Sequence, residues 1–126
     1  DLAIGSRYVP GGGTRGWPLH RQALSRAGGL YARTLLRLGI ADPTAGFCCW
    51  RRDLLERIDL ASLSASGYGF QIELKLNARR LGARIEEVPI IFTEREHGAS
   101  KMTTAIATEA LRVVARLALG GRGSQR

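Results

Sequence analysis

Short apolar segments typical of buried strands alternate along this chain with longer segments of helical periodicity. This alternation predicts an α/β or α+β layer structure, because strands pair into a sheet that helices then cover. Only three strands are expected, which is few for a sheet that is stable on its own. We therefore expect the sheet to continue in residues outside this sequence. The expected elements are a strand over 1–5, a glycine-rich loop over 9–16, a helix over 18–38, a strand over 45–50, a short helix over 51–58, a serine-rich loop over 59–67, a helix over 70–81, a strand over 83–93, a polar loop over 94–101, a helix over 102–119 and a tail over 120–126.

The first long helix is expected to meet the core through Leu24, Tyr31, Leu35 and Leu38, which recur at helical spacing. Pro18 suits its first turn, because the missing N–H of proline costs nothing there. The glycine-rich loop before it has two open interpretations, an ordinary connector or a lid over a site.

Two local signals are expected in the second half. Gly82 suits the position that closes the helix over 70–81, and Pro89 marks an edge or a bulge in the strand over 83–93. The adjacent Cys48 and Cys49 lie in an apolar run, where neighbours on a strand point to opposite faces. We therefore expect two reduced cysteines rather than a disulfide or a shared metal site.

The composition is typical of one compact domain that buries a hydrophobic core. The 126 residues are 44% hydrophobic and 24% charged. The net charge is +8, and 17 of the 19 cations are arginines, whose planar fork matches phosphate. This favours a polyanionic partner: nucleic acid, anionic lipid or a phosphorylated substrate. Aromatic residues make up only 6% and no nucleic-acid signature is present, so nucleic acid is not expected.

Three residues form a candidate phosphate site. Arg21 and Ser25 are four apart and share one helix face, and Arg7 follows the end of the first strand, where α/β proteins place ligand sites. A solvated polar face is the alternative interpretation.

Two faces could contact a membrane. One is an arginine stripe at helical spacing, formed by Arg26, Arg33 and Arg37. This stripe is either a solvated helix face or a contact surface for anionic lipid headgroups. The helix over 102–119 is broadly apolar, so it either packs on the domain or lies on a membrane surface. No stretch reaches the roughly 18 apolar residues that a membrane span needs.

Further candidates lie near the second helix and in the polar loop. Glu73 follows a Gly-Tyr-Gly turn near a helix start, as either a surface residue or an active-site carboxylate. His97 is most often a surface loop residue, but it lies in a polar cluster that could bind phosphate. That cluster also holds Arg95, Ser100 and Lys101. No cysteine, histidine and carboxylate set has zinc spacing, and no metal ligand is assigned.

Four ordered motifs carry a family resemblance. They are Ile4-Gly5-Ser6-Arg7-Tyr8 with the glycine loop and Trp17-Pro18-x-x-Arg21-x-x-x-Ser25; Asp42-x-Thr44-x-Gly46-Phe47; Gly67-Tyr68-Gly69-Phe70-Gln71-Ile72-Glu73; and Glu87-Val88-Pro89-Ile90 with Phe92-x-x-Arg95-x-x-Gly98-x-Ser100-Lys101-Met102. Together they resemble the C-terminal half of polyprenol (dolichol) monophosphate mannose synthases, family 2 glycosyltransferases of GT-A fold.

The resemblance implies a fold and an activity. The fold would be the C-terminal part of a Rossmann-like sandwich with a mixed, mainly parallel sheet. Residues 1–119 would form the acceptor-side half, 120–126 would be a disordered tail, and an N-terminal nucleotide-binding half would be missing. The implied enzyme is an inverting polyprenyl-phosphate β-mannosyltransferase. It would transfer mannose from GDP-mannose to polyprenyl or dolichyl phosphate, peripherally at the cytoplasmic face of a membrane.

The resemblance also implies residue roles. Arg7, Arg21 and Ser25 would receive the acceptor phosphate, and Glu73 would lie where related transferases carry a catalytic acid. Arg95, His97, Ser100 and Lys101 fall in a loop that closes over the donor. The Mg²⁺ or Mn²⁺ ligands are expected in the missing half, so this stretch alone is expected to be inactive.

One departure and two alternatives stay open. A basic residue is expected after Phe47, where this chain has Cys48. The transferred sugar could be another hexose, such as glucose. A module of a different class, basic and non-catalytic, would bind only anionic membrane.

Overall fold

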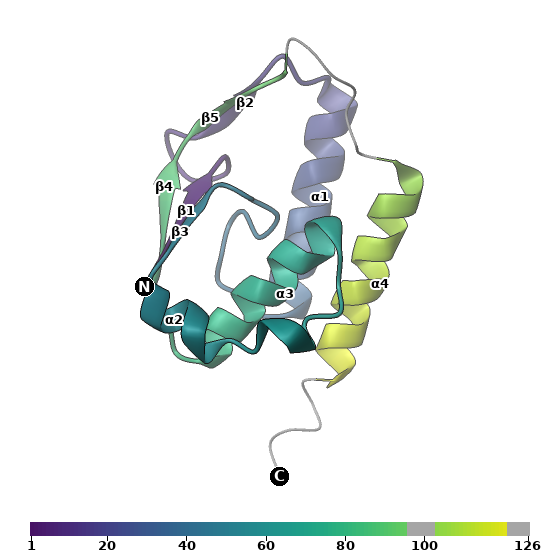
Figure 1. Ribbon diagram of the computed structural model, residues 1–126. Helices are drawn as coiled ribbons and strands as arrows, with labels where there is room; N and C mark the ends of the chain where they lie inside the picture. The colour runs from purple at the N-terminus through teal and green to yellow at the C-terminus, as the bar shows by residue number, and fades with distance from the viewer. Residues whose placement is uncertain (96–102, 121–126) are drawn as a thin grey trace.

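The structure, a computed structural model, describes residues 1–95 and 103–120 (Figure 1). Its elements are β1 (Leu2–Ser6), β2 (Gly13–Arg15), α1 (Leu19–Leu35), β3 (Cys48–Trp50), α2 (Arg52–Arg57), the 3₁₀ helix η1 (Leu60–Ser62), α3 (Gly67–Arg80), β4 (Ile85–Pro89), β5 (Ile91–Thr93) and α4 (Thr104–Gly120). The strands lie together at the left of Figure 1, and α1, α3 and α4 lie to their right.

The strand β1 is central to a three-stranded sheet in the order β3-β1-β4. It runs antiparallel to β3, with Leu2 opposite Trp50, and parallel to β4, with Leu2 opposite Ile85. A second sheet pairs β2 with β5 in parallel. The predicted α/β class with a mixed sheet is therefore confirmed.

Two strand boundaries differ from the prediction. The stretch 9–16 is not wholly a loop, because β2 forms inside it. The expected strand over 83–93 is divided: β4 ends at Pro89 and pairs with β1, while β5 begins at Ile91 and pairs with β2. Proline donates no N–H to a ladder, which fits the predicted interruption at Pro89.

The helices follow the expected order with shifted ends. The helix α1 begins after Pro18 but ends at Leu35, and α3 begins at Gly67, three residues before its expected start. Gly82 has a φ of +74° after the end of α3, which confirms its predicted closing position. Gly120, which was expected to belong to the tail, is the last residue of α4. Residues 121–126 lie outside the described residues.

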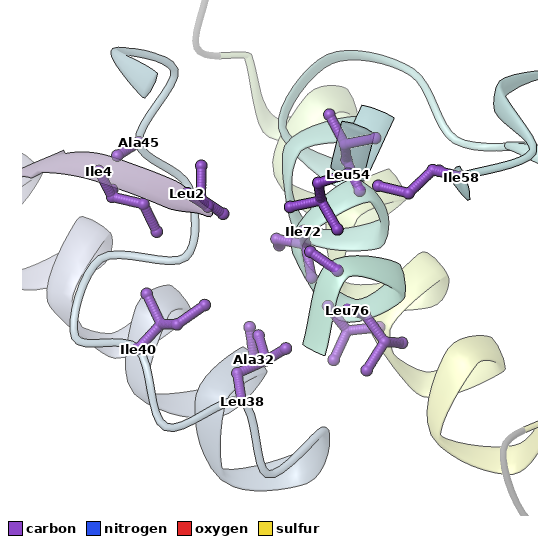
Figure 2. Close-up of a cluster of buried hydrophobic side chains, with 13 residues drawn as sticks. Leu2, Ile4, Ala32, Leu38, Ile40, Ala45, Leu54, Ile58, Ile72 and Leu76 are labelled. Carbon is purple, nitrogen blue, oxygen red and sulfur yellow. The ribbon is translucent and has the colours of Figure 1, made fainter. Parts of the chain in front are cut away.

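The core lies between the sheet and the helices (Figure 2). Leu2 and Ile4 of β1 face Ile72 and Leu76 of α3, and all four are at most 5% exposed. Burial of such aliphatic side chains contributes about 1.5–3 kcal/mol each. Ala32, Leu38, Ile40, Ala45, Leu54, Ile58, Leu74, Ala78 and Val114 complete the cluster.

The predicted core face of the first long helix is wrong at three of its four residues, and only Leu38 belongs to the core. Leu24, Tyr31 and Leu35 are 52%, 36% and 45% exposed, and the buried Leu38 lies beyond the helix end. Gly29 and Ala32 are the buried residues of α1 instead. Small side chains let the helix backbone approach the core closely, so the larger side chains point elsewhere.

Within the described residues no helix is long and apolar enough to cross a membrane. Both cysteines are free, as predicted, with Cys48 half-buried and Cys49 exposed on β3.

Candidate functional site

A polar pocket of about 230 Å³ opens where the parallel strands β1 and β4 end. Loops that follow the carboxyl ends of parallel strands commonly form ligand sites. Arg7, Trp17, Arg21, Glu94 and Arg95 are among the residues that line this pocket. The structure therefore brings together three of the arginines that the sequence analysis singled out.

Arg7 is fixed by a buried carboxylate. Its Nε and Nη2 donate to the two carboxylate oxygens of Asp42, each at 2.7 Å, and Nη2 also donates to Thr44 Oγ1 at 3.0 Å. The Arg7 side chain is 10% exposed and that of Asp42 is fully buried. Burial lowers the pKa of Arg7, but the hydrogen bond and the charge of Asp42 outweigh it and raise the pKa above its ordinary value. Arg7 is therefore a fixed, permanent cation.

Asp42 is held in turn by Glu87 of β4. The Glu87 carboxylate accepts the backbone N–H of Ala41 at 2.8 Å and that of Asp42 at 2.9 Å. The sequence analysis quoted Asp42 and Glu87 within motifs but gave them no role.

Arg21 is held by an aromatic ring and by a second carboxylate. Its guanidinium carbon lies 4.1 Å from the centre of the Trp17 ring, a cation–π contact. Its Nη1 donates to Glu94 Oε2 at 2.5 Å. Trp17 packs edge-on against Phe92, with 5.6 Å between ring centres. Within the described residues, Trp17 Nε1 and Arg21 Nε are buried nitrogens without a hydrogen-bond partner.

Ser25 does not line the polar pocket but lies at the adjoining groove, where its Oγ accepts a 2.6 Å hydrogen bond from the Tyr8 hydroxyl. Two of the predicted phosphate ligands thus share one pocket, and the third lies next to it.

An apolar groove of about 300 Å³ adjoins the polar pocket between α1 and α4. Leu24, Gly28 and Tyr31 of α1 line one side of it, and Leu111 and Val114 of α4 line the other. Two residues wrongly predicted to meet the core, Leu24 and Tyr31, therefore form part of a groove wall, which explains their exposure.

Glu73 lies outside both cavities. It is 6% exposed, and its Oε2 accepts the backbone N–H groups of Ser64 and Ala65 at 3.1 and 3.0 Å. This geometry supports a structural role that fixes the loop before α3, and it gives no support to the expected catalytic role.

The expected closing loop is described only at its start. Arg95 is exposed and lines the polar pocket. His97, Ser100 and Lys101 lie outside the described residues.

Lys75 was not predicted to have a role, because a lysine on a helix is usually exposed. It is fully buried, and its Nζ donates to the Ala45 carbonyl oxygen at 2.6 Å, which ties α3 to the loop that lines the pocket. Burial lowers the pKa of Lys75 and raises that of the neighbouring Cys48 thiol.

The part of the chain that the structure describes offers no group of three metal-ligating side chains. The carboxylate of Glu94, which lines the pocket, and that of Asp42, which is buried behind Arg7, are each paired with an arginine. These residues therefore do not fit Mg²⁺ or Mn²⁺, which needs several oxygen ligands.

Two curated proteins match nearly the whole chain. Polyprenol monophosphomannose synthase from Mycolicibacterium smegmatis is 51% identical over 122 residues, which are 97% of this chain and 46% of that protein. Undecaprenyl-phosphate mannosyltransferase from Micrococcus luteus is 49% identical over 122 residues, which are 97% of this chain and 50% of that protein. No protein-family model matches. The similarity to polyprenol-phosphate mannose synthases that the four motifs predicted is confirmed, and the chain spans about half the length of these relatives.

Proposed function

We propose that this chain is the acceptor-binding part of a polyprenyl-phosphate mannosyltransferase. One observation carries the proposal: the polar pocket and the apolar groove adjoin each other and share Arg7, Trp17, Arg21, Thr44 and Tyr68 as lining residues. A prenyl phosphate has the same division into an anionic head and an apolar chain. The names of the two relatives, which specify polyprenol or undecaprenyl phosphate, support the same acceptor.

The proposed acceptor phosphate lies at the arginines, with Ser25 beside it, and the prenyl chain follows the groove between α1 and α4. Arg21 is best placed to bind the phosphate, since Arg7 already donates two hydrogen bonds to Asp42. Arg7 would contribute its charge and any remaining N–H group.

In the proposed reaction, a phosphate oxygen of the acceptor attacks the anomeric carbon of mannose. The bond from that carbon to the nucleoside diphosphate breaks, and attack from the opposite face inverts the configuration. A phosphate monoester is already an anion at neutral pH, so it needs positioning and charge neutralisation more than a general base. A pocket lined by arginines, with Glu73 outside it, suits this chemistry.

The donor side of the proposal rests on the motif resemblance. The proposed donor is GDP-mannose. The proposed Mg²⁺ or Mn²⁺ would be bound by residues outside this sequence in a GT-A domain. The loop that would close over the donor contains Arg95, His97, Ser100 and Lys101. Another hexose, such as glucose, is the alternative within this chemistry, and the relatives' names favour mannose.

We also propose a membrane surface as partner. Arg26, Leu30 and Arg33 line one shallow hollow on α1, and Leu30 is 53% exposed. Leucine beside arginine is typical of a helix that lies on an anionic bilayer. A module that only binds membrane is the alternative: it would float with anionic vesicles yet show no preference for a prenyl phosphate.

The test is calorimetric titration of the 126-residue chain with farnesyl phosphate. We expect tighter binding than for farnesol or inorganic phosphate. Arg21→Ala should weaken it about tenfold, because a hydrogen bond to a charged group contributes about 1.5–3 kcal/mol. The control Arg52→Ala removes the same charge from an exposed pair with Glu56 and should leave the affinity unchanged. Equal binding of farnesol, or equal effects of the two substitutions, would contradict the proposal.

A further inference from the structure

Glu94 occupies one of the two outer nitrogens through which an incoming phosphate could bind Arg21. Its Oε2 accepts a 2.5 Å hydrogen bond from Arg21 Nη1, and the two side chains are 35% and 20% exposed. We propose that Glu94 is an intramolecular competitor: it pairs with Arg21 in the anion-free site and leaves the arginine when phosphate binds. The inference rests on the proposed acceptor site and adds a residue that governs its affinity.

The charges in the pocket favour an exchange. Arg7 and Arg21 are balanced by Asp42 and Glu94, and Arg95 is an exposed cation on the lining. A phosphate monoester brings about −1.5 to −2 charges at neutral pH. If both carboxylates stayed, it would face like charges at short range, which raises its free energy in the site. Displacement of one carboxylate would relieve this repulsion.

The difference in burial between Asp42 and Glu94 indicates which carboxylate the phosphate would displace. Asp42 is fully buried, accepts two side-chain hydrogen bonds from Arg7, and has its own backbone held by Glu87. Glu94 is a third exposed, and its carboxylate makes one hydrogen bond among the described residues. Exposed pairs contribute less than buried ones, so displacing Glu94 costs less than displacing Asp42.

The setting of Arg21 limits a ligand to the two outer nitrogens of the guanidinium, Nη1 and Nη2. Its Nε is a buried atom and its guanidinium lies on the Trp17 ring. An anion must therefore approach the outer nitrogens, and Glu94 already occupies Nη1. The Trp17 ring holds the guanidinium in place throughout, so the exchange needs only the Glu94 side chain to move.

The two roles that Glu94 could have predict opposite changes in anion affinity when Glu94 is removed. A competitor lowers the affinity of every anion that uses Arg21 by the same factor, so its removal tightens binding without changing selectivity. A residue that positions Arg21 for the ligand would do the reverse, and its removal would weaken binding.

The experiment titrates the 126-residue chain with inorganic phosphate and with farnesyl phosphate at fixed ionic strength. Glu94→Gln should bind both about two- to fivefold more tightly. The control Glu86→Gln makes the same change in net charge at an exposed residue outside the pocket and should leave both affinities unchanged. In an Arg21→Ala background the effect of Glu94→Gln should vanish, because the competitor has lost its partner. Glu94→Ala provides a second variant.

Unchanged or weaker binding of inorganic phosphate by both Glu94 variants would overturn the inference. So would an equal gain in Glu86→Gln, because it would show an effect of net charge alone. If the Glu94 variants gain affinity for phosphate but farnesyl phosphate binds no better than phosphate, the competitor is supported and the prenyl acceptor is not.

Discussion

At the scale of single residues, the site depends on carboxylates whose partners lie far away in the sequence. Arg7 and Arg21 could be predicted from the sequence, because arginine after a strand end and on an adjoining helix face is typical of phosphate sites. Asp42 and Glu87 could not be assigned, because Asp42 is 35 residues from Arg7 and Glu87 is 45 residues from Asp42. Glu73 was expected to be catalytic, but it accepts backbone hydrogen bonds from the loop before α3. The sequence does not distinguish these two roles, because a carboxylate near a helix start can have either.

Asp42→Asn is expected to destabilise the fold by about 3 kcal/mol, because it leaves Arg7 a buried cation without its counter-charge. The measurement is the free energy of unfolding in urea. The control Glu56→Gln breaks an exposed pair with Arg52, whose side chains are 60% and 87% exposed, and should cost less than about 1 kcal/mol. Similar losses in both variants would show that the Arg7–Asp42 pair contributes little.

At the scale of the elements, the order of strands and helices could be predicted but the packing of α1 could not. Helical periodicity locates an apolar stripe, and it does not say whether that stripe meets the core or another cavity. In α1 the contact with the core is made by Gly29 and Ala32, while Leu24 and Tyr31 line the groove. The pairing of β2 with β5 was missed for a related reason, because a three-residue strand is too short to give an alternating pattern.

The turn between β1 and β2 needs glycine where it folds back on β1. A Cβ at Gly12 would lie 2.6 Å from the Ser6 carbonyl oxygen and 2.9 Å from the Arg7 carbonyl carbon. Gly12→Ala is therefore expected to cost about 1–3 kcal/mol in urea unfolding and to weaken farnesyl phosphate binding by displacing Arg7.

Gly28→Ala is the matched control for the effect of that substitution on stability. A Cβ at Gly28 meets no atom within 4 Å, and alanine stabilises a helix interior by about 1 kcal/mol over glycine. We expect a gain in stability at this position. A loss equal to that of Gly12→Ala would contradict the close approach of the turn to β1.

At the scale of the whole molecule, the candidate site is made by two helices from opposite ends of the chain. Tyr31 of α1 donates to the Leu111 carbonyl oxygen of α4 at 3.4 Å, across a separation of 80 residues. The two helices meet beside Arg7, which follows β1, and Arg21 of α1, so the apolar groove adjoins the polar pocket and shares these arginines with it. The sequence predicted each helix and each arginine, but not the cavity, because no local pattern records that α1 and α4 are neighbours.

The central claim is that one amphiphile spans this cavity, with its phosphate at Arg21 and its prenyl chain between α1 and α4. The most direct measurement is NMR on the methyl-labelled 126-residue chain with bound farnesyl phosphate. We predict nuclear Overhauser contacts from the prenyl methyl groups to Leu24, Leu111 and Val114, together with a phosphorus shift that Arg21→Ala abolishes. Contacts to exposed leucines outside the groove, such as Leu60, or a phosphorus shift that survives Arg21→Ala, would contradict the claim.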